Sequence, residues 1–221
     1  MGRGPHAPVT APGPDGMAIF SHRAGAALTQ SPIVERPTGL PRFTKGLLKW
    51  SFAIGVVPPV ALVVGLAVRS LYVVDYVHVL TGASWTGFDI YTGVVLSRVM
   101  RSLEIPARVE ISKRLTPTTF FIIPSLAAVA ITSGIYLAQE MGKFNLGDPW
   151  ILAAGGIVVV LTVQGFGVFL PNGVRIFLEL AKVKPDPALI SRLTMRNVRL
   201  AGSQAVFQVL IILVMAHLAV Y

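Results

Sequence analysis

Cysteine is absent from this chain of 221 residues, and charged residues make up only 13% of it. The first absence excludes disulfides, thiolate metal sites, iron–sulfur clusters and cysteine nucleophiles. The second argues against an ordinary soluble domain, in which roughly a quarter of the residues are charged. The sequence also contains no Walker loop, nucleophile elbow, HExxH pair or dinucleotide fingerprint. No familiar catalytic motif therefore assigns a reaction.

What the chain has instead is apolar sequence. Hydrophobic residues make up 53% of it, and the mean hydropathy is +0.69. Several apolar runs approach the 20 residues that a helix needs to cross a bilayer, where every backbone polar group must be satisfied internally. The sequence predicts an all-α fold, a polytopic membrane bundle of five transmembrane helices. The predicted spans cover residues 47–68, 73–99, 118–139, 150–170 and 200–221.

Residues 1–42 differ in composition from the rest of the chain. They are rich in Pro, Gly and small residues and contain no long apolar run. Such a segment buries too little surface to offset the entropy of ordering. We expect a disordered cytoplasmic tail at 1–42, followed by a transmembrane domain at 43–221.

The basic residues test the span count. In the five-span arrangement all but two of the 19 Lys and Arg fall on one side of the membrane, and the exceptions are Arg69 and Lys143. Because Lys and Arg collect on the cytoplasmic side, this distribution predicts an inner amino terminus and an outer carboxyl terminus in the cell membrane. The formal net charge of +9 is then an orientation signal, and no nucleic-acid partner is expected.

Several local features suggest where the helices are interrupted. Pro171, Asn172 and Gly173 predict the end of the fourth span, and residues 174–182 read as a short amphipathic surface helix. The basic runs at 111–115 and 192–199 read as solvated cytoplasmic loops that contact anionic headgroups.

Two histidines lie inside predicted spans, His78 and His217. Each lies roughly 6–8 Å from the outer end of its helix, given a rise of 1.5 Å per residue. Paired imidazoles on antiparallel helices suit axial ligation of a b-type haem, which requires no cysteine. The alternative is that each histidine is a hydrogen-bonded packing residue.

Around His78 the second span carries a stripe of residues at helical spacing, with Gly82, Trp85 and Asp89 following at i+4, i+7 and i+11. Gly82 leaves room for a flat cofactor or a neighbouring backbone, and Trp85 is placed to form a wall of that space. The alternative is helix packing through small residues.

Asp89 is an acidic residue in an apolar span. A carboxylate in hydrocarbon costs several kcal/mol and normally faces the bundle interior or a water-filled cavity. Gln164 and Gln208 of other spans fall at a comparable depth, and Gln204 lies one turn nearer the cytoplasm, so we expect a buried polar cluster of Asp89 with these three glutamines. Arg98 or Arg199 is a candidate to close it from the interface. The cluster is either a proton relay or substrate site, or else interhelical hydrogen bonding.

The spacing His78-x6-Trp85-x-Gly87 resembles the pattern of a loose group of membrane families. The group comprises the copper-resistance-D-like proteins, the bacterial membrane protoporphyrinogen oxidase and related uncharacterised predicted integral membrane proteins. The resemblance covers mainly residues 73–138 and implies a small helical bundle in which His78 matches a proposed haem ligand. The essential lysine of the oxidase branch has no counterpart, because Lys49, at the edge of the first predicted span, is the only Lys within the span bounds and none lies deeper in a span.

These observations support three hypotheses. The first is a b-type haem-binding or redox-associated bundle, with His78 and His217 as iron ligands and a quinone or other membrane subunits as candidate partners besides the lipid bilayer. The alternative is a non-enzymatic small permease or an accessory subunit of a membrane complex. The third is an enzyme resembling protoporphyrinogen oxidase. The sequence leaves open whether the protein is an enzyme.

Overall fold

The structure is a computed structural model, and it describes residues 1–2 and 42–220. Nearly all of the predicted tail lies outside these residues. The described part of the chain is almost entirely helical, with short connecting turns and without strands, which confirms the all-α prediction. The helices in chain order are α1 (Arg42–Ala67), α2 (Leu71–Ile90), η2 (Tyr91–Leu96), α3 (Ser97–Ser102), α4 (Ile105–Thr119), α5 (Ile122–Glu140), α6 (Pro149–Gln164), η3 (Gly165–Phe169), α7 (Leu170–Leu180) and α8 (Pro187–Val220).

Local sequence sets several of the helix ends. Ser70 caps α2, since its hydroxyl accepts from the backbone N–H of Val73, and Asp148 caps α6 in the same way. Pro149 follows Asp148 at the helix start, where a missing amide costs nothing. Gly142 follows α5 with a φ of 67°, the left-handed conformation that glycine adopts without strain.

Four helices are long and apolar enough to cross a membrane: Thr44–Ala67, Ile122–Glu140, Pro149–Leu180 and Pro187–Val220. This length and composition fit an integral membrane protein. The remaining predicted span, 73–99, is helical throughout but is not among these four. It carries Asp75, His78 and Asp89, which lower its hydropathy. The fifth span and the orientation stay predictions.

Two breaks expected from the sequence are absent. The helix that begins at Pro149 continues through Pro171, Asn172 and Gly173 to Leu180, so residues 174–182 do not form a separate surface helix. The π-helical segment η3 precedes Pro171 and changes the hydrogen-bond pattern there, which accommodates a residue without an N–H. The two basic runs are also helical, in α4 and in the first half of α8.

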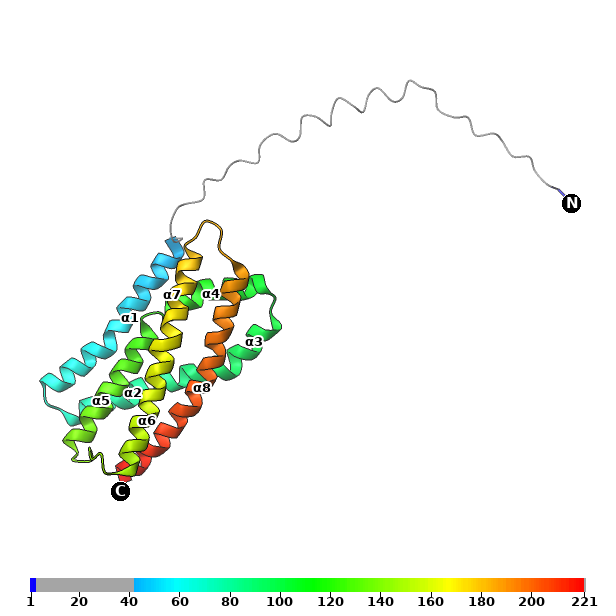
Figure 1. The fold of residues 1–221 in the computed structure, drawn as a ribbon. Helices are drawn as coiled ribbons and strands as arrows, with labels where there is room; N and C mark the ends of the chain where they lie inside the picture. Colours follow the sequence, from blue (N-terminus) through cyan, green and yellow to red (C-terminus); the bar gives the residue numbers. More distant parts are fainter. Residues whose placement is uncertain (3–41, 221) are drawn as a thin grey trace. The chain divides into compact units, whose positions relative to one another are not determined.

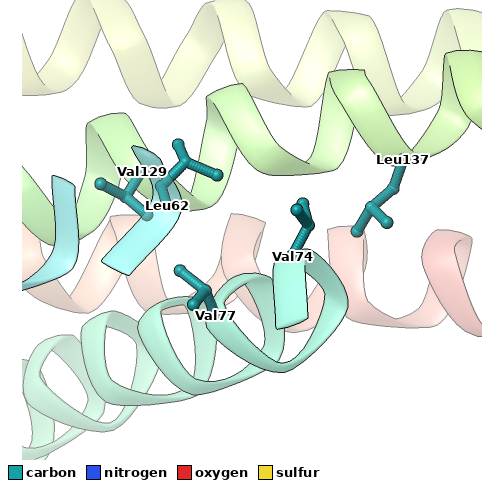
Figure 2. Packing of buried hydrophobic residues seen from close by; sticks show 5 residues of the cluster. All are labelled: Leu62, Val74, Val77, Val129 and Leu137. Atoms are coloured by element: carbon teal, nitrogen blue, oxygen red, sulfur yellow. The ribbon is translucent and has the colours of Figure 1, made fainter. Parts of the chain in front are cut away.

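The long helices run side by side in the bundle (Figure 1), with the α7–α8 turn at one end and the carboxyl end of α8 at the other. Within it, α2 packs against α1, α5 and α8. A buried apolar cluster joins α1, α2 and α5 through Leu62, Val74, Val77, Val129 and Leu137, and Figure 2 shows their side chains in the space between these helices. This packing fixes α2, so that its stripe of polar residues faces other helices.

Candidate functional site

Asp89, near the end of α2, is buried with 1% of its surface exposed. Its Oδ2 accepts a hydrogen bond of 2.9 Å from Nε2 of Gln208 on α8. None of the ion pairs among residues 42–220 involves Asp89. The carboxylate is therefore held by a neutral amide. It can still neutralise the charge of a cation or accept a hydrogen bond from a further donor.

Two further polar groups lie close to Asp89. The indole of Trp85, one turn earlier on α2, interacts with the carboxylate, but its N–H makes no hydrogen bond to any described residue. The hydroxyl of Thr92, in η2, is likewise buried and has no hydrogen-bond partner in the described bundle. Buried polar atoms are normally satisfied, so unpaired groups beside a carboxylate are a feature that requires an explanation.

The three glutamines of the predicted cluster have different partners. Gln208 contacts Asp89 directly, whereas Gln204 donates to the carbonyl of Leu161 on α6 at 3.3 Å. Gln164 donates to the hydroxyl of Ser203 at 3.3 Å, which places it beside α8 as well. The structure thus brings Asp89 together with Gln208, while Gln204 and Gln164 join α6 to α8 nearby.

A cavity of about 180 Å³ adjoins this cluster. Its walls come from α2, η2, α4, α5, α6, η3, α7 and α8, and they include Asp89, Thr92 and Gln204. Most of the remaining lining is apolar, with a set of aromatic side chains: Trp85, Phe88, Phe120, Phe166 and Phe169. A largely apolar cavity with a few convergent polar groups is the usual form of a small-molecule site.

The arginines expected to close the cluster do not do so. Arg98 donates to the carbonyl of Val94 on its own helix at 3.2 Å. Arg199 lines a separate groove between α3, the start of α4 and the first half of α8. Asp89 therefore has no cationic partner among the described residues.

His78 is held by α5. Its Nδ1 lies 2.9 Å from the carbonyl oxygen of Ala130 and 3.2 Å from the hydroxyl of Ser133. Gly134 makes room for the ring, since a Cβ at that position would lie 2.8 Å from the His78 Cε1. Contact with a carbonyl through Nδ1 favours the tautomer whose Nε2 carries the lone pair.

His217 has a different neighbour. Its ring stacks on Trp150 of α6, with the ring centroids 3.9 Å apart and an interplanar angle of 24°. His78 and His217 thus contact different helices, and their joint ligation of a haem stays a prediction. Gly82 adjoins open space, because a Cβ there would meet no described atom within 4 Å.

Two helix backbones approach each other closely at Gly93, a residue that the sequence pattern did not distinguish from the other glycines. Gly93, in η2, faces Gly202 of α8 so closely that a Cβ on Gly93 would lie 2.5 Å from the Gly202 nitrogen. Gly93 follows Asp89 by one helical turn, and Gly202 precedes Gln208. This contact sets the spacing of the two helices that carry the Asp89–Gln208 pair. With 21 glycines in the chain, composition gives no means of selecting these two.

Comparison of the chain with protein-family models, with curated proteins and with solved structures finds no match. The resemblance to the copper-resistance-D-like and membrane protoporphyrinogen oxidase group therefore stays a prediction. It depends on His78, Trp85 and Gly87 of α2.

Proposed function

We propose that this chain is a multi-pass protein of the cell membrane, with its amino terminus inside, that works as a small permease for organic cations. The observation that carries the proposal is the placement of Asp89, a buried carboxylate on the wall of a cavity and without a cationic partner in the described bundle. A carboxylate in an apolar environment is costly and such residues mark substrate or ion pathways.

The other walls of the cavity fit the same class of ligand. Trp85, Phe88, Phe120 and Phe166 all contribute to the lining. Aromatic groups attract cations through the ring quadrupole, and aromatic cages bind quaternary ammonium groups. The volume of about 180 Å³ restricts the ligand to a few heavy atoms, because a cavity of roughly 150 Å³ accommodates a molecule the size of benzene.

Choline and its uncharged isostere 3,3-dimethylbutan-1-ol form a pair of probes that differ only in the cation. We expect choline to raise the thermal unfolding temperature of the purified protein, and the alcohol of equal shape to have a much smaller effect. At a ligand concentration of 100 Kd the stabilisation is about 2.7 kcal/mol. Uptake of radiolabelled choline into proteoliposomes then measures transport.

The matched variants are Asp89→Asn and Asp75→Asn, which remove one carboxylate each from α2. Asp75 is exposed and does not line the cavity. We expect Asp89→Asn to abolish both the choline effect and the uptake, and Asp75→Asn to retain them. Equal stabilisation by the uncharged isostere, or full uptake by Asp89→Asn, would contradict the proposal. Folded protein without binding or uptake would favour the accessory-subunit alternative.

One observation favours haem binding as a second candidate. The contact between Nδ1 of His78 and the Ala130 carbonyl resembles the way that metal-ligating histidines are held by a backbone carbonyl through their other nitrogen. In this candidate His78 and His217 would hold the iron, and a bound haem would supply one-electron transfer.

The absorption spectrum of protein purified from haem-supplied cells tests this candidate. We expect a Soret band that shifts on addition of dithionite and is lost in His78→Ala and in His217→Ala. The variant Asp75→Asn serves as the control, because Asp75 is an exposed residue of the same helix and lies outside the motif. Protein that shows no Soret band after expression with adequate haem would eliminate the haem candidate and leave the permease proposal untouched.

A further inference from the structure

A second hollow lies at the α7–α8 end of the bundle, apart from the Asp89 cavity. It is a groove of about 850 Å³ between α3, the start of α4 and the first half of α8, with Val168 of η3 on its wall. Five arginines line this groove, and no acidic residue does: Arg101, Arg108, Arg192, Arg196 and Arg199. We refer to it as the arginine groove.

The arginine groove carries uncompensated charge. The ion pairs of the described chain join Lys113 and Arg114 to Glu110, and Lys182 to Glu179. No groove arginine is a member of these pairs. Arg192, Arg196 and Arg199 occupy positions i, i+4 and i+7 of α8, so they share one helix face and repel one another. A bound anion would relieve this repulsion.

The opposite wall presents arginines that are already held in place. Nε of Arg101 donates to the Ser97 carbonyl at 3.1 Å, and Nε of Arg108 donates to the Leu103 carbonyl at 2.9 Å. A guanidinium has five N–H donors, so each retains donors for a ligand. Planar guanidinium groups that are fixed beforehand suit bidentate contacts with phosphate.

The groove is also partly apolar, and this property distinguishes between possible anions. Ile105, Val168, Met195 and Leu200 line it together with the arginines. Val168 and Leu200 belong to the helices Pro149–Leu180 and Pro187–Val220, which are apolar enough to cross a membrane. The groove therefore extends from a charged helix end onto apolar membrane-facing helices. A small hydrophilic anion would leave this apolar part without a partner.

We propose that the arginine groove is a binding site for an anionic phospholipid, with the phosphate among the arginines and the acyl chains along the apolar part. Basic pockets between transmembrane helices on the inner side of a membrane are a recognised form of headgroup site. The site is separate from the Asp89 cavity, so it does not depend on cation transport and rests only on the proposed inner position of this end of the bundle.

The test uses the full-length protein in detergent micelles, titrated with phosphatidylglycerol and analysed by native mass spectrometry. We expect a retained phosphatidylglycerol molecule, little retention of phosphatidylcholine and no displacement by an equal concentration of inorganic phosphate. The double variant Arg192→Gln/Arg196→Gln should weaken phosphatidylglycerol binding by on the order of tenfold or more, because each basic residue near a lipid surface contributes severalfold to the affinity.

The matched control is Lys113→Gln/Lys184→Gln, which removes the same charge from exposed positions outside the groove. We expect it to change the affinity less than twofold. Equal loss in the control and the groove variant would overturn the proposal, because binding would then depend on overall charge alone. Equal retention of phosphatidylcholine, or displacement by inorganic phosphate, would also overturn it, the latter in favour of a site for soluble phosphate. The charge-preserving pair Arg192→Lys/Arg196→Lys should weaken binding less than the glutamines.

Discussion

The substitution Gly93→Ala is expected to disrupt the bundle, with a loss of more than about 3 kcal/mol of unfolding free energy. The added Cβ would lie 2.5 Å from the Gly202 nitrogen and 3.2 Å from the Ala201 carbonyl carbon. These are backbone atoms, which cannot move aside as a side chain can, so η2 and α8 must separate. Size-exclusion chromatography and thermal unfolding in detergent, followed by circular dichroism, measure the effect.

The partner glycine provides the control for this prediction. A Cβ on Gly202 would lie 3.5 Å from the Gly93 Cα, which is an ordinary van der Waals distance. We therefore expect Gly202→Ala to be folded and close to the native protein in stability, although it adds the same methyl group to the same interface. Equal behaviour of the two variants would show that η2 and α8 adjust freely, contrary to the close packing of small residues between membrane helices.

The second large effect is expected at the Asp89–Gln208 pair. Replacing Gln208 with leucine removes the 2.9 Å hydrogen bond to Asp89 and leaves the buried carboxylate with the indole of Trp85 as its remaining polar neighbour. We expect Gln208→Leu to lower the unfolding free energy by about 2–4 kcal/mol. The double variant Asp89→Leu/Gln208→Leu should be less destabilised than Gln208→Leu, because it no longer contains a buried acid that has lost its amide partner.

Asp89→Asn should change stability in the opposite direction. The Oε1 of Gln208 is buried and without a partner in the described bundle, and an asparagine at 89 brings an N–H₂ group that can donate to it. With the charge also removed, we expect a gain of about 1–3 kcal/mol. Thermal unfolding measures each change, and the native protein with Asp89→Leu, Gln208→Leu and their double variant gives the coupling energy of the pair. A loss of stability in Asp89→Asn would indicate that the carboxylate itself holds the helices together.

Composition was sufficient to predict the helical class, because few charges and long apolar runs leave no other fold for a chain in lipid. The residues of the polar cluster could also be selected, since Asp89 and the glutamines stand out in apolar helices. Which of the glutamines pairs with Asp89 could not be predicted. Which amide reaches Asp89 depends on helix rotation and spacing, and these are set by contacts such as that between Gly93 and Gly202.

The arginine groove could not be predicted from the sequence for a related reason. Arg101 and Arg108 are far in sequence from Arg192 and Arg196, and both groups lie outside the predicted spans. Residues 192–199 could not be assigned to the helix of the last span, because basic residues at a membrane surface suit a loop and a helix equally. The helix places them along one face, and tertiary packing brings that face against α3 and α4.

The π-helical segment η2 has a consequence for comparing this chain with any relative. A turn closed by i→i+5 hydrogen bonds contains one residue more than an α-helical turn, so the side chains after Tyr91 point in directions that a uniform helix would not give them. The helix segment that carries Asp89 and the segment that carries Arg101 are therefore rotated about the helix axis relative to each other, compared with a uniform α-helix. A homologue that lacks one residue between 91 and 96 would keep the helix, but its two segments would be rotated differently about the axis. It could then have lost either the Asp89 cavity or the arginine groove, and a sequence alignment in which both sets of residues are present would not show which.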